Sequence, residues 1–240
     1  MTAIRGLLFD KDGTLFDFRA TWGGWTRRVI LALAEGSQAQ GARLQQLLGY
    51  DLASGDFAAD SAVIAHTTAE IRDLILPVLP PQDEGALLDR MNRLAAENEM
   101  VEAVELVPLF TRFRDMGLKV GLATNDAEMP ARTHLRRAAI DGHFDFVAGF
   151  DSGWGGKPAT GQMRAFLERT GLRPAEVAMV GDSLHDLDAG RAAGMRTVAV
   201  LTGIAGAAAL APHADVVLNH IGELPDWVLA QESASTRSNG

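Results

Sequence analysis

Two aspartates stand close together directly after an apolar run near the amino terminus. The run from Ile4 to Phe9 predicts a short buried strand, and Asp10, Asp12 and Gly13 follow it, with the glycine permitting a sharp turn. Two carboxylates at this spacing repel each other unless a cation or a shared proton relieves them. The pair suits a carboxylate nucleophile beside a second carboxyl that moves protons, with a hard cation holding both. These residues alone also allow a simpler interpretation, a turn with two polar caps.

Further apolar runs along the chain predict more strands, and helix-length amphipathic segments separate them. The predicted strands cover residues 118–123, 145–150, 176–180, 196–201 and 214–218, and the predicted helices cover 108–117, 130–139, 159–170 and 186–194. This alternation predicts an α/β fold, a Rossmann-like doubly wound parallel sheet with helices on both faces. Because right-handed crossovers place the carboxyl ends of all strands at one edge, we expect the polar residues there to share one crevice. They are Asp10, Asp12, Thr124, Lys157, Asp182 and Asp186.

Two of the later runs end in residues that suit phosphate binding. Thr124 and Asn125 follow the second predicted strand, where a hydroxyl and a backbone N–H can both donate to phosphate oxygens. Lys157 lies in a loop with three glycines, and its charge would neutralise a phosphate or the nucleophile itself. The loop is not a Walker A motif, because Asp151 occupies the position of its first glycine and Pro158 that of its Ser/Thr.

Asp182 and Asp186 follow Gly181 at a predicted junction from strand to helix. Together with Asp10 they supply the oxygen-only, carboxylate-rich environment that magnesium prefers. The alternative is that Asp182 and Asp186 cap the helix and interact favourably with its dipole.

The segment from Asp17 to Ala103 has a different pattern. It lacks a comparable strand series and is rich in helical stretches, among them 25–34, 42–48 and 84–98. We expect it to form a helical cap domain over residues 17–103, inserted into an α/β core domain made of residues 1–16 and 104–230. The small polar residues from Gln231 to Gly240 predict a disordered tail.

The composition limits the class of protein. The 240-residue chain carries a net charge of -9 and has a pI near 5.1, so neither nucleic acid nor an anionic membrane is expected as the main partner. The absence of cysteine excludes disulfides, thiolate metal sites and cysteine nucleophiles. The first strand begins at once, leaving no room for a signal peptide, and no apolar run approaches the roughly 18 residues of a membrane span. We therefore expect a soluble cytoplasmic protein; the sequence does not indicate its oligomeric state.

Four motifs occur in one order along the chain, between Phe9 and about Gly203. They are Asp-x-Asp-Gly-Thr, then Thr-Asn, then Lys-Pro, then Gly-Asp-x-x-x-Asp. In this order they resemble the haloacid dehalogenase-like hydrolase superfamily. The helical insertion directly after the first motif resembles the cap of its phosphoglycolate phosphatase-like branch.

The resemblance implies roles for individual residues. Asp10 would be the nucleophile and Asp12 the general acid and base, while Thr124 and Lys157 would bind the phosphoryl group. Magnesium would be held by Asp10, Asp182, Asp186 and the backbone carbonyl of Asp12. The chain departs from the family at Lys11, where an apolar residue is usual, and at Phe18, where many relatives have a small hydroxyl residue. By strand alternation the Lys11 side chain should point away from the nucleophile.

The predicted activity is magnesium-dependent hydrolysis of a small phosphate monoester, with an aspartyl phosphate as the intermediate. The aspartate at position 12 favours a phosphatase or a mutase, because dehalogenase relatives lack it and need no proton for a halide. The alternatives are a β-phosphoglucomutase-like enzyme and a non-catalytic phospho-switch or binding module. Phosphoglycolate is the substrate that the resemblance implies. Arg19, with Trp22, would then select it by pairing with its carboxylate; alternatively, Arg19 is solvated and Trp22 is cap core.

Overall fold

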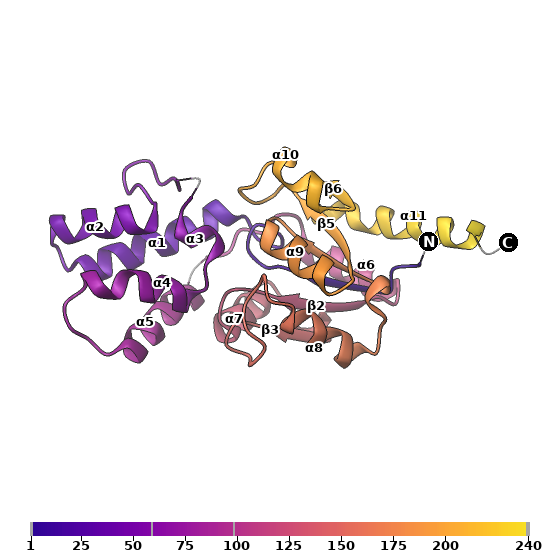
Figure 1. The fold of residues 1–240 in the computed structure, drawn as a ribbon, viewed down its shortest axis with the longest axis horizontal. Coiled ribbons are helices and arrows are strands. Elements are labelled where there is room, and N and C mark those ends of the chain that lie inside the picture. Colours follow the sequence, from indigo (N-terminus) through magenta and orange to yellow (C-terminus); the bar gives the residue numbers. More distant parts are fainter. Residues whose placement is uncertain (1, 59, 98, 239–240) are drawn as a thin grey trace.

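Six parallel strands form one sheet in the computed structural model, which describes residues 2–58, 60–97 and 99–238 (Figure 1). Across the sheet the strands lie in the order β3-β2-β1-β4-β5-β6. Their bounds are Gly6–Phe9 (β1), Lys119–Ala123 (β2), Phe146–Ala148 (β3), Val177–Gly181 (β4), Arg196–Val200 (β5) and Val216–Leu218 (β6). Strands β2 and β3 extend the sheet on one side of β1, and β4, β5 and β6 extend it on the other side. The predicted doubly wound α/β fold is confirmed.

Helices cover both faces of this sheet. They are α6 (Leu106–Asp115), α7 (Glu128–Arg137), α8 (Gly161–Thr170), α9 (Leu184–Ala192), α10 (Ala207–Leu210) and α11 (Leu224–Ser238). Side chains of Leu7 and Phe9 pack in one apolar cluster with α6, α7 and α11. Leu8 packs in the other cluster, with α8 and α9. Successive side chains of a strand point to opposite faces of the sheet, so β1 contributes to the apolar clusters on both faces.

The segment between β1 and α6 is helical and occupies the other end of the molecule (Figure 1). It contains α1 (Phe18–Ala34), α2 (Gln38–Leu48), α3 (Ala62–Ala65), α4 (Thr68–Ile75) and α5 (Glu84–Ala96). These helices have an apolar cluster of their own, in which Trp22, Trp25, Val29 and Ile30 are buried. We therefore keep as a proposal the boundaries predicted from the sequence, a cap over 17–103 inserted into a core of 1–16 and 104–230.

Short 3-10 turns join several of these elements. They cover Leu76–Val78, Asp141–His143, Pro174–Glu176, Ala211–His213 and Ile221–Glu223.

The carboxyl terminus differs from the sequence prediction. Helix α11 continues through Ser238, whereas a disordered tail was expected over 231–240, of which 239 and 240 lie outside the described residues. Between Gln231 and Ser238 the chain has no glycine or proline to interrupt the helix, so the backbone can extend it although the side chains are small and polar. In the part of the chain that the structure describes, α11 included, no helix has the length and apolarity needed to cross a membrane.

Candidate active site

The register of the central strands brings the predicted site residues to one edge of the sheet. Phe9 lies opposite Val180 on β4, and the Asp10 N–H donates to the Val180 carbonyl at 2.8 Å. Asp182 and Thr124 directly follow β4 and β2, the two neighbours of β1. The order of the strands reverses at β1, and ligands of doubly wound sheets bind at the carboxyl edge at such a point.

Lys157 is the cation at the centre of the first cluster of charged residues. Its Nζ lies 2.7 Å from Asp10 Oδ1 and 2.6 Å from Asp186 Oδ1, and its side chain is almost fully buried. Burial by itself lowers the pKa of this ammonium, but the charges of Asp10 and Asp186 outweigh that effect and raise it. Lys157 is therefore a permanent positive charge beside the predicted nucleophile.

Negative charge nevertheless exceeds positive charge in this cluster. Carboxylate oxygens of Asp10, Asp182 and Asp186 all lie within 4.8 Å of one another, and they face one ammonium. Burial, together with the neighbouring Asp186 carboxylate, raises the pKa of Asp10 to about 7. Burial and the charges of Asp10 and Asp186 raise the pKa of Asp182 well above its usual range. A divalent cation would relieve this repulsion, and the donors are the hard oxygens that it would need.

Asp186 caps a helix and also lies in the charged cluster, so its predicted role as a metal ligand stays open. One of its oxygens contacts Lys157, and the other accepts hydrogen bonds from the Ser183 N–H at 3.1 Å and the Ser183 hydroxyl at 2.7 Å. With Ser183 it thus completes a capping box at the start of α9. The cap fixes the carboxylate beside Lys157, so the structural and the chemical interpretations are compatible.

Two glycines leave the space that Asp182 occupies. Gly13 has a φ of 77°, a backbone conformation that favours glycine, and a Cβ there would overlap the Asp182 carboxylate. A Cβ at Gly203 would overlap the same side chain. Gly13 therefore serves the turn after β1 and also the packing of a predicted metal ligand.

The predicted phosphate-binding residues also lie at this edge. Thr124 Oγ1 accepts a hydrogen bond from the Asp126 N–H at 3.0 Å, which leaves its own proton to donate elsewhere. Asn125 joins its loop to that of Lys157 by a reciprocal pair: the Lys157 N–H donates to Asn125 Oδ1 at 2.7 Å, and Asn125 Nδ2 donates to the Lys157 carbonyl at 3.0 Å. The Asn125 side chain thus helps to hold the lysine loop in place, and phosphate binding by its backbone N–H stays a prediction.

A second charged cluster, which the sequence did not reveal, surrounds Lys11. The Lys11 ammonium is fully buried and lies 2.9 Å from Asp12 Oδ2 and 3.1 Å from Asp126 Oδ2. It also lies 3.1 Å from His134 Nδ1 and 5.4 Å from the centre of the Trp22 ring. Burial by itself lowers the pKa of Lys11, but the charges of Asp12 and Asp126 outweigh that effect and raise the pKa. A lysine between two motif aspartates was the only local signal of this cluster.

His134 in this cluster is neutral, and its two neighbours define its tautomer. Burial and the Lys11 charge lower the pKa of His134 to about 2. Its Nε2 lies 2.8 Å from the Ala95 carbonyl and therefore carries the proton, so Nδ1 accepts from Lys11. Ala95 is near the end of α5, so His134 links the turn after β1 to the helical segment.

A cavity lies where the helical segment faces this edge. Its polar wall includes Asp10, Asp12, Thr124, Lys157 and Asp182. Its opposite wall is largely apolar and is formed by Phe18, Trp22, Val63, Ile64 and Ile71, with His66 and Thr68 among them. The cavity thus combines a charged floor with an apolar wall, as expected for a small polar group attached to a neutral body.

The two residues predicted to select the substrate have different positions. Trp22 lines the cavity and is also buried against Trp25, so it is both wall and core. Arg19 is not among the described residues that line the cavity; its Nη1 lies 2.7 Å from Asp56 Oδ1 in an exposed ion pair. Asp56 lies close to α1 only in the folded chain, so the sequence around Arg19 gave no sign of this partner.

Comparison with known proteins agrees with this site. The sequence model of the haloacid dehalogenase-like hydrolase family matches residues 4–194. The chain belongs to this family. The resemblance noted in the sequence is therefore confirmed, with the matched region running from β1 past the end of α9.

Individual relatives carry phosphatase names. The chain is 31% identical over 236 residues to pyrophosphatase PpaX of Bacillus velezensis, covering 92% of this chain and 94% of that protein. It is 35% identical over 113 residues to phosphoglycolate phosphatase of Chromobacterium violaceum, covering 47% of this chain and 50% of that protein. Several curated relatives are thus matched over only 50–60% of their own length. The structure of a HAD phosphatase from Thermococcus onnurineus has a similar fold, with a TM-score of 0.66, 24% identity and coverage of 94% and 98%.

Proposed function

We propose that this protein is a magnesium-dependent phosphatase that hydrolyses a small phosphate monoester through an aspartyl phosphate on Asp10. The observation that carries the proposal is the position of Asp10, at a sheet edge beside Lys157 and two further buried carboxylates. Asp12 follows on the same turn and lines the same cavity. The phosphatase names of the relatives support the reaction class.

In the first step an Asp10 carboxylate oxygen attacks phosphorus, and the bond from phosphorus to the leaving oxygen breaks. Asp12, in its protonated form, gives its proton to that oxygen, so the leaving group departs as an alcohol. Lys157 and the Thr124 hydroxyl stabilise the negative charge on the phosphoryl oxygens. The Lys157 ion pair also keeps Asp10 at the sheet edge.

In the second step water attacks the phosphorus of the aspartyl phosphate. Asp12, now a carboxylate, takes a proton from this water, and the bond between phosphorus and Asp10 breaks. Inorganic phosphate leaves, and Asp10 and Asp12 return to their starting forms. Each aspartate therefore completes a cycle with no net consumption of protons at either side chain.

The residues at the edge fit a magnesium ion. Asp10, Asp182, Asp186 and the Asp12 carbonyl would hold it, and the repulsion that raises the pKa values of Asp10 and Asp182 is the observation that favours a cation there. When bound, magnesium supplies positive charge that lowers the repulsion between the anionic nucleophile and the anionic phosphate. Calcium, with its larger and more flexible coordination shell, fits in-line transfer less well.

The residues of the apolar wall indicate which kind of leaving group the cavity can accept. Relatives are named for phosphoglycolate and for pyrophosphate, whose leaving groups are anionic. Of the described residues between 17 and 103, no lysine or arginine lines the cavity, and Arg19 is paired with Asp56. An anionic leaving group would lack a permanent positive partner on that wall. We therefore propose a small phosphorylated metabolite with a neutral alcohol as the leaving group, and a cytoplasmic location in keeping with the cysteine-free chain.

A panel of phosphate compounds tests this proposal. Purified protein with magnesium is assayed for phosphate release from alkyl monoesters, sugar phosphates, phosphoglycolate, pyrophosphate and p-nitrophenyl phosphate. We expect kcat/KM to be highest for a monoester with an uncharged leaving group. Preference for phosphoglycolate or pyrophosphate would contradict the assignment of the leaving group. No release from any compound would contradict the phosphatase itself.

A further inference from the structure

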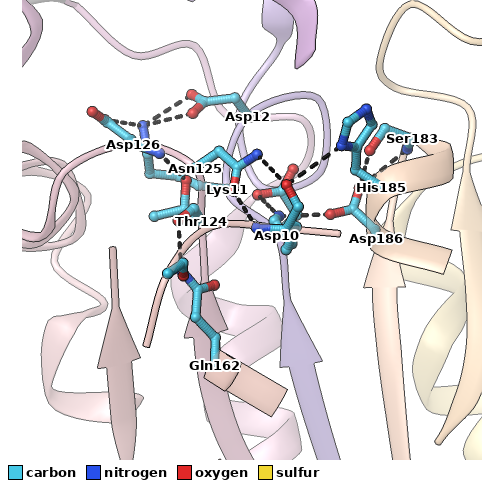
Figure 2. Close-up of polar contacts among 12 residues, drawn as sticks. Asp10, Lys11, Asp12, Thr124, Asn125, Asp126, Gln162, Ser183, His185 and Asp186 are labelled. Atoms are coloured by element: carbon cyan, nitrogen blue, oxygen red, sulfur yellow. Dashed lines mark hydrogen bonds and ion pairs between the residues drawn. The ribbon is translucent and has the colours of Figure 1, made fainter. Parts of the chain in front are cut away.

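We propose that Lys11 is a positioning residue for Asp12: its buried ammonium holds the Asp12 carboxyl group in the place from which it exchanges protons with the leaving group and with water. This inference rests on the proposed function, since it concerns the general acid of that reaction. Figure 2 shows the Asp12 carboxylate directed at the Lys11 ammonium, with Asp126 on the other side of the ammonium.

The contacts of Lys11 leave it little freedom. The Lys11 ammonium hydrogen-bonds to the Asp12 carboxylate and to His134 Nδ1, and it forms an ion pair with Asp126 Oδ2 at 3.1 Å. Both oxygens of Asp12 lie close, at 3.0 Å and 2.9 Å from Nζ. The position of the ammonium is thus fixed, and it contacts both carboxylate oxygens of Asp12.

The surroundings of Lys11 are equally fixed. The Lys11 side chain is 0% exposed and the Asp126 side chain 0%, whereas Asp12 keeps 11% exposure where it lines the cavity. His134 is anchored by its bond to the Ala95 carbonyl, and Asp126 accepts a hydrogen bond from the Ala127 N–H at 2.8 Å. Asp126 also lines the cavity, but its side chain is closed off from solvent. The buried Lys11 and Asp126 side chains therefore form a support, and Asp12 is the carboxylate of this cluster whose side chain is partly exposed.

A merely structural role for Lys11 is the competing explanation, and the test must separate the two. Removal of Lys11 alone would leave the Asp126 carboxylate buried without its cation, which destabilises a fold strongly. The informative variant is therefore Lys11→Met combined with Asp126→Asn, because this removes the positive and the negative charge together. Its reference is Asp126→Asn alone, in which the pair of Lys11 with Asp12 remains.

The measurement compares leaving groups. Proton donation by Asp12 matters most for an alkyl monoester, whose alkoxide is a strong base, and least for p-nitrophenyl phosphate, whose phenolate leaves without help. Relative to Asp126→Asn, the double variant should lose about 10- to 100-fold in kcat/KM for the alkyl ester, within the range of general acid catalysis. We compare kcat/KM because it reports the first step, whereas hydrolysis of the aspartyl phosphate is common to both esters. Its loss for p-nitrophenyl phosphate should be much smaller.

A second set of variants tests whether Lys11 acts through Asp12. In proteins that already carry Asp12→Asn and Asp126→Asn, adding Lys11→Met should change kcat/KM for the alkyl ester little, because residues that act as a unit are not additive. Lys119→Met is a matched control, since Lys119 forms an exposed ion pair with Asp145 at the opposite end of β2. It should leave the ratio of the two rates unchanged.

The outcomes are distinct. Three outcomes would each overturn the positioning role: equal losses of kcat/KM for both esters in a folded double variant, an unchanged or higher kcat/KM for the alkyl ester, or full additivity with Asp12→Asn. Folding is checked independently of activity, by circular dichroism and cooperative thermal unfolding. Failure of the wild-type protein to hydrolyse any ester would instead count against the proposed function, and so the two failures are separable.

Discussion

Two charged clusters lie side by side at the carboxyl end of β1, one around Lys157 and one around Lys11. In the Lys157 cluster three carboxylates face one ammonium, and the pKa values of Asp10 and Asp182 are raised as a result. In the Lys11 cluster an ammonium meets two carboxylates and a neutral histidine that offers it a lone pair. The aspartates of the first motif thus belong to different electrostatic environments although they are two residues apart.

The difference indicates how each cluster is completed. The Lys157 cluster keeps an excess of negative charge next to the cavity, which suits a divalent cation and a phosphate. In the Lys11 cluster two carboxylates also face one ammonium, and burial raises the pKa of Asp126 to about 6. The ammonium itself is fully enclosed by protein groups, and of its two carboxylate partners only Asp12 has a partly exposed side chain. One cluster is therefore arranged for ligands, and the other is arranged to hold a side chain.

The largest expected effect is on the nucleophile of the Lys157 cluster. Asp10→Asn should lower kcat by at least about 10³-fold, because loss of a catalytic nucleophile removes the covalent step. The variant keeps the shape of the side chain, so its circular dichroism and cooperative thermal unfolding should match the wild type. Turnover near the wild-type level, with mass spectrometry showing no deamidation of residue 10, would refute the assignment.

The second effect tests whether a cation completes the Lys157 cluster. Removal of metal with EDTA should abolish phosphate release, and magnesium at about 100 times its Kd should raise Tm of the metal-free protein by about 5–10 °C. Asp182→Asn should reduce this shift. Calcium should bind without supporting turnover. Full activity after exhaustive chelation would show that the reaction needs no ion.

A third effect distinguishes the Lys11 cluster by its response to acid. The pKa of His134 is lowered from its ordinary value of 6.5 to about 2, so below pH 6.5 the unfolded chain binds a proton here that the folded chain does not. The stability that His134 contributes is therefore full above pH 6.5 and is lost as the pH falls further.

His134→Asn keeps an acceptor for Lys11 and cannot be protonated in this range. Between pH 8 and pH 5.5 the wild type should therefore lose about 1.4 kcal/mol more than the variant, or about 3–6 °C in Tm. Thermal unfolding of both proteins across this range measures the difference. Parallel curves would show that the histidine is charged in the folded protein.

The smallest expected effect lies outside both clusters, at Arg19. An exposed ion pair such as the one between Arg19 and Asp56 contributes about 0–1 kcal/mol to stability. Arg19→Ala should therefore change KM for phosphoglycolate and for p-nitrophenyl phosphate by less than about twofold, as the arginine does not line the cavity. An increase in KM confined to phosphoglycolate would restore the role predicted from the sequence.

The sequence by itself determined the sheet and the members of the Lys157 cluster. Each strand is a short apolar run. Asp10 and Asp182 directly follow a strand, Asp186 lies in the first turn of α9, and Lys157 lies in the loop between β3 and α8. Since parallel strands share one carboxyl edge, local order along the chain was enough to place Asp10, Lys157 and Asp182 together. No partner had to be known for that inference.

Only the tertiary structure decided what surrounds Lys11 and Arg19. His134 is 123 residues from Lys11 along the chain, and its contact depends on how α7 packs between the turn after β1 and the end of α5. Likewise, Asp56 meets Arg19 only because the loop after α2 folds back on α1. Such pairs follow from the packing of whole elements, which no local pattern of residues encodes, and this is why Asp12 could be identified from its motif but its support could not.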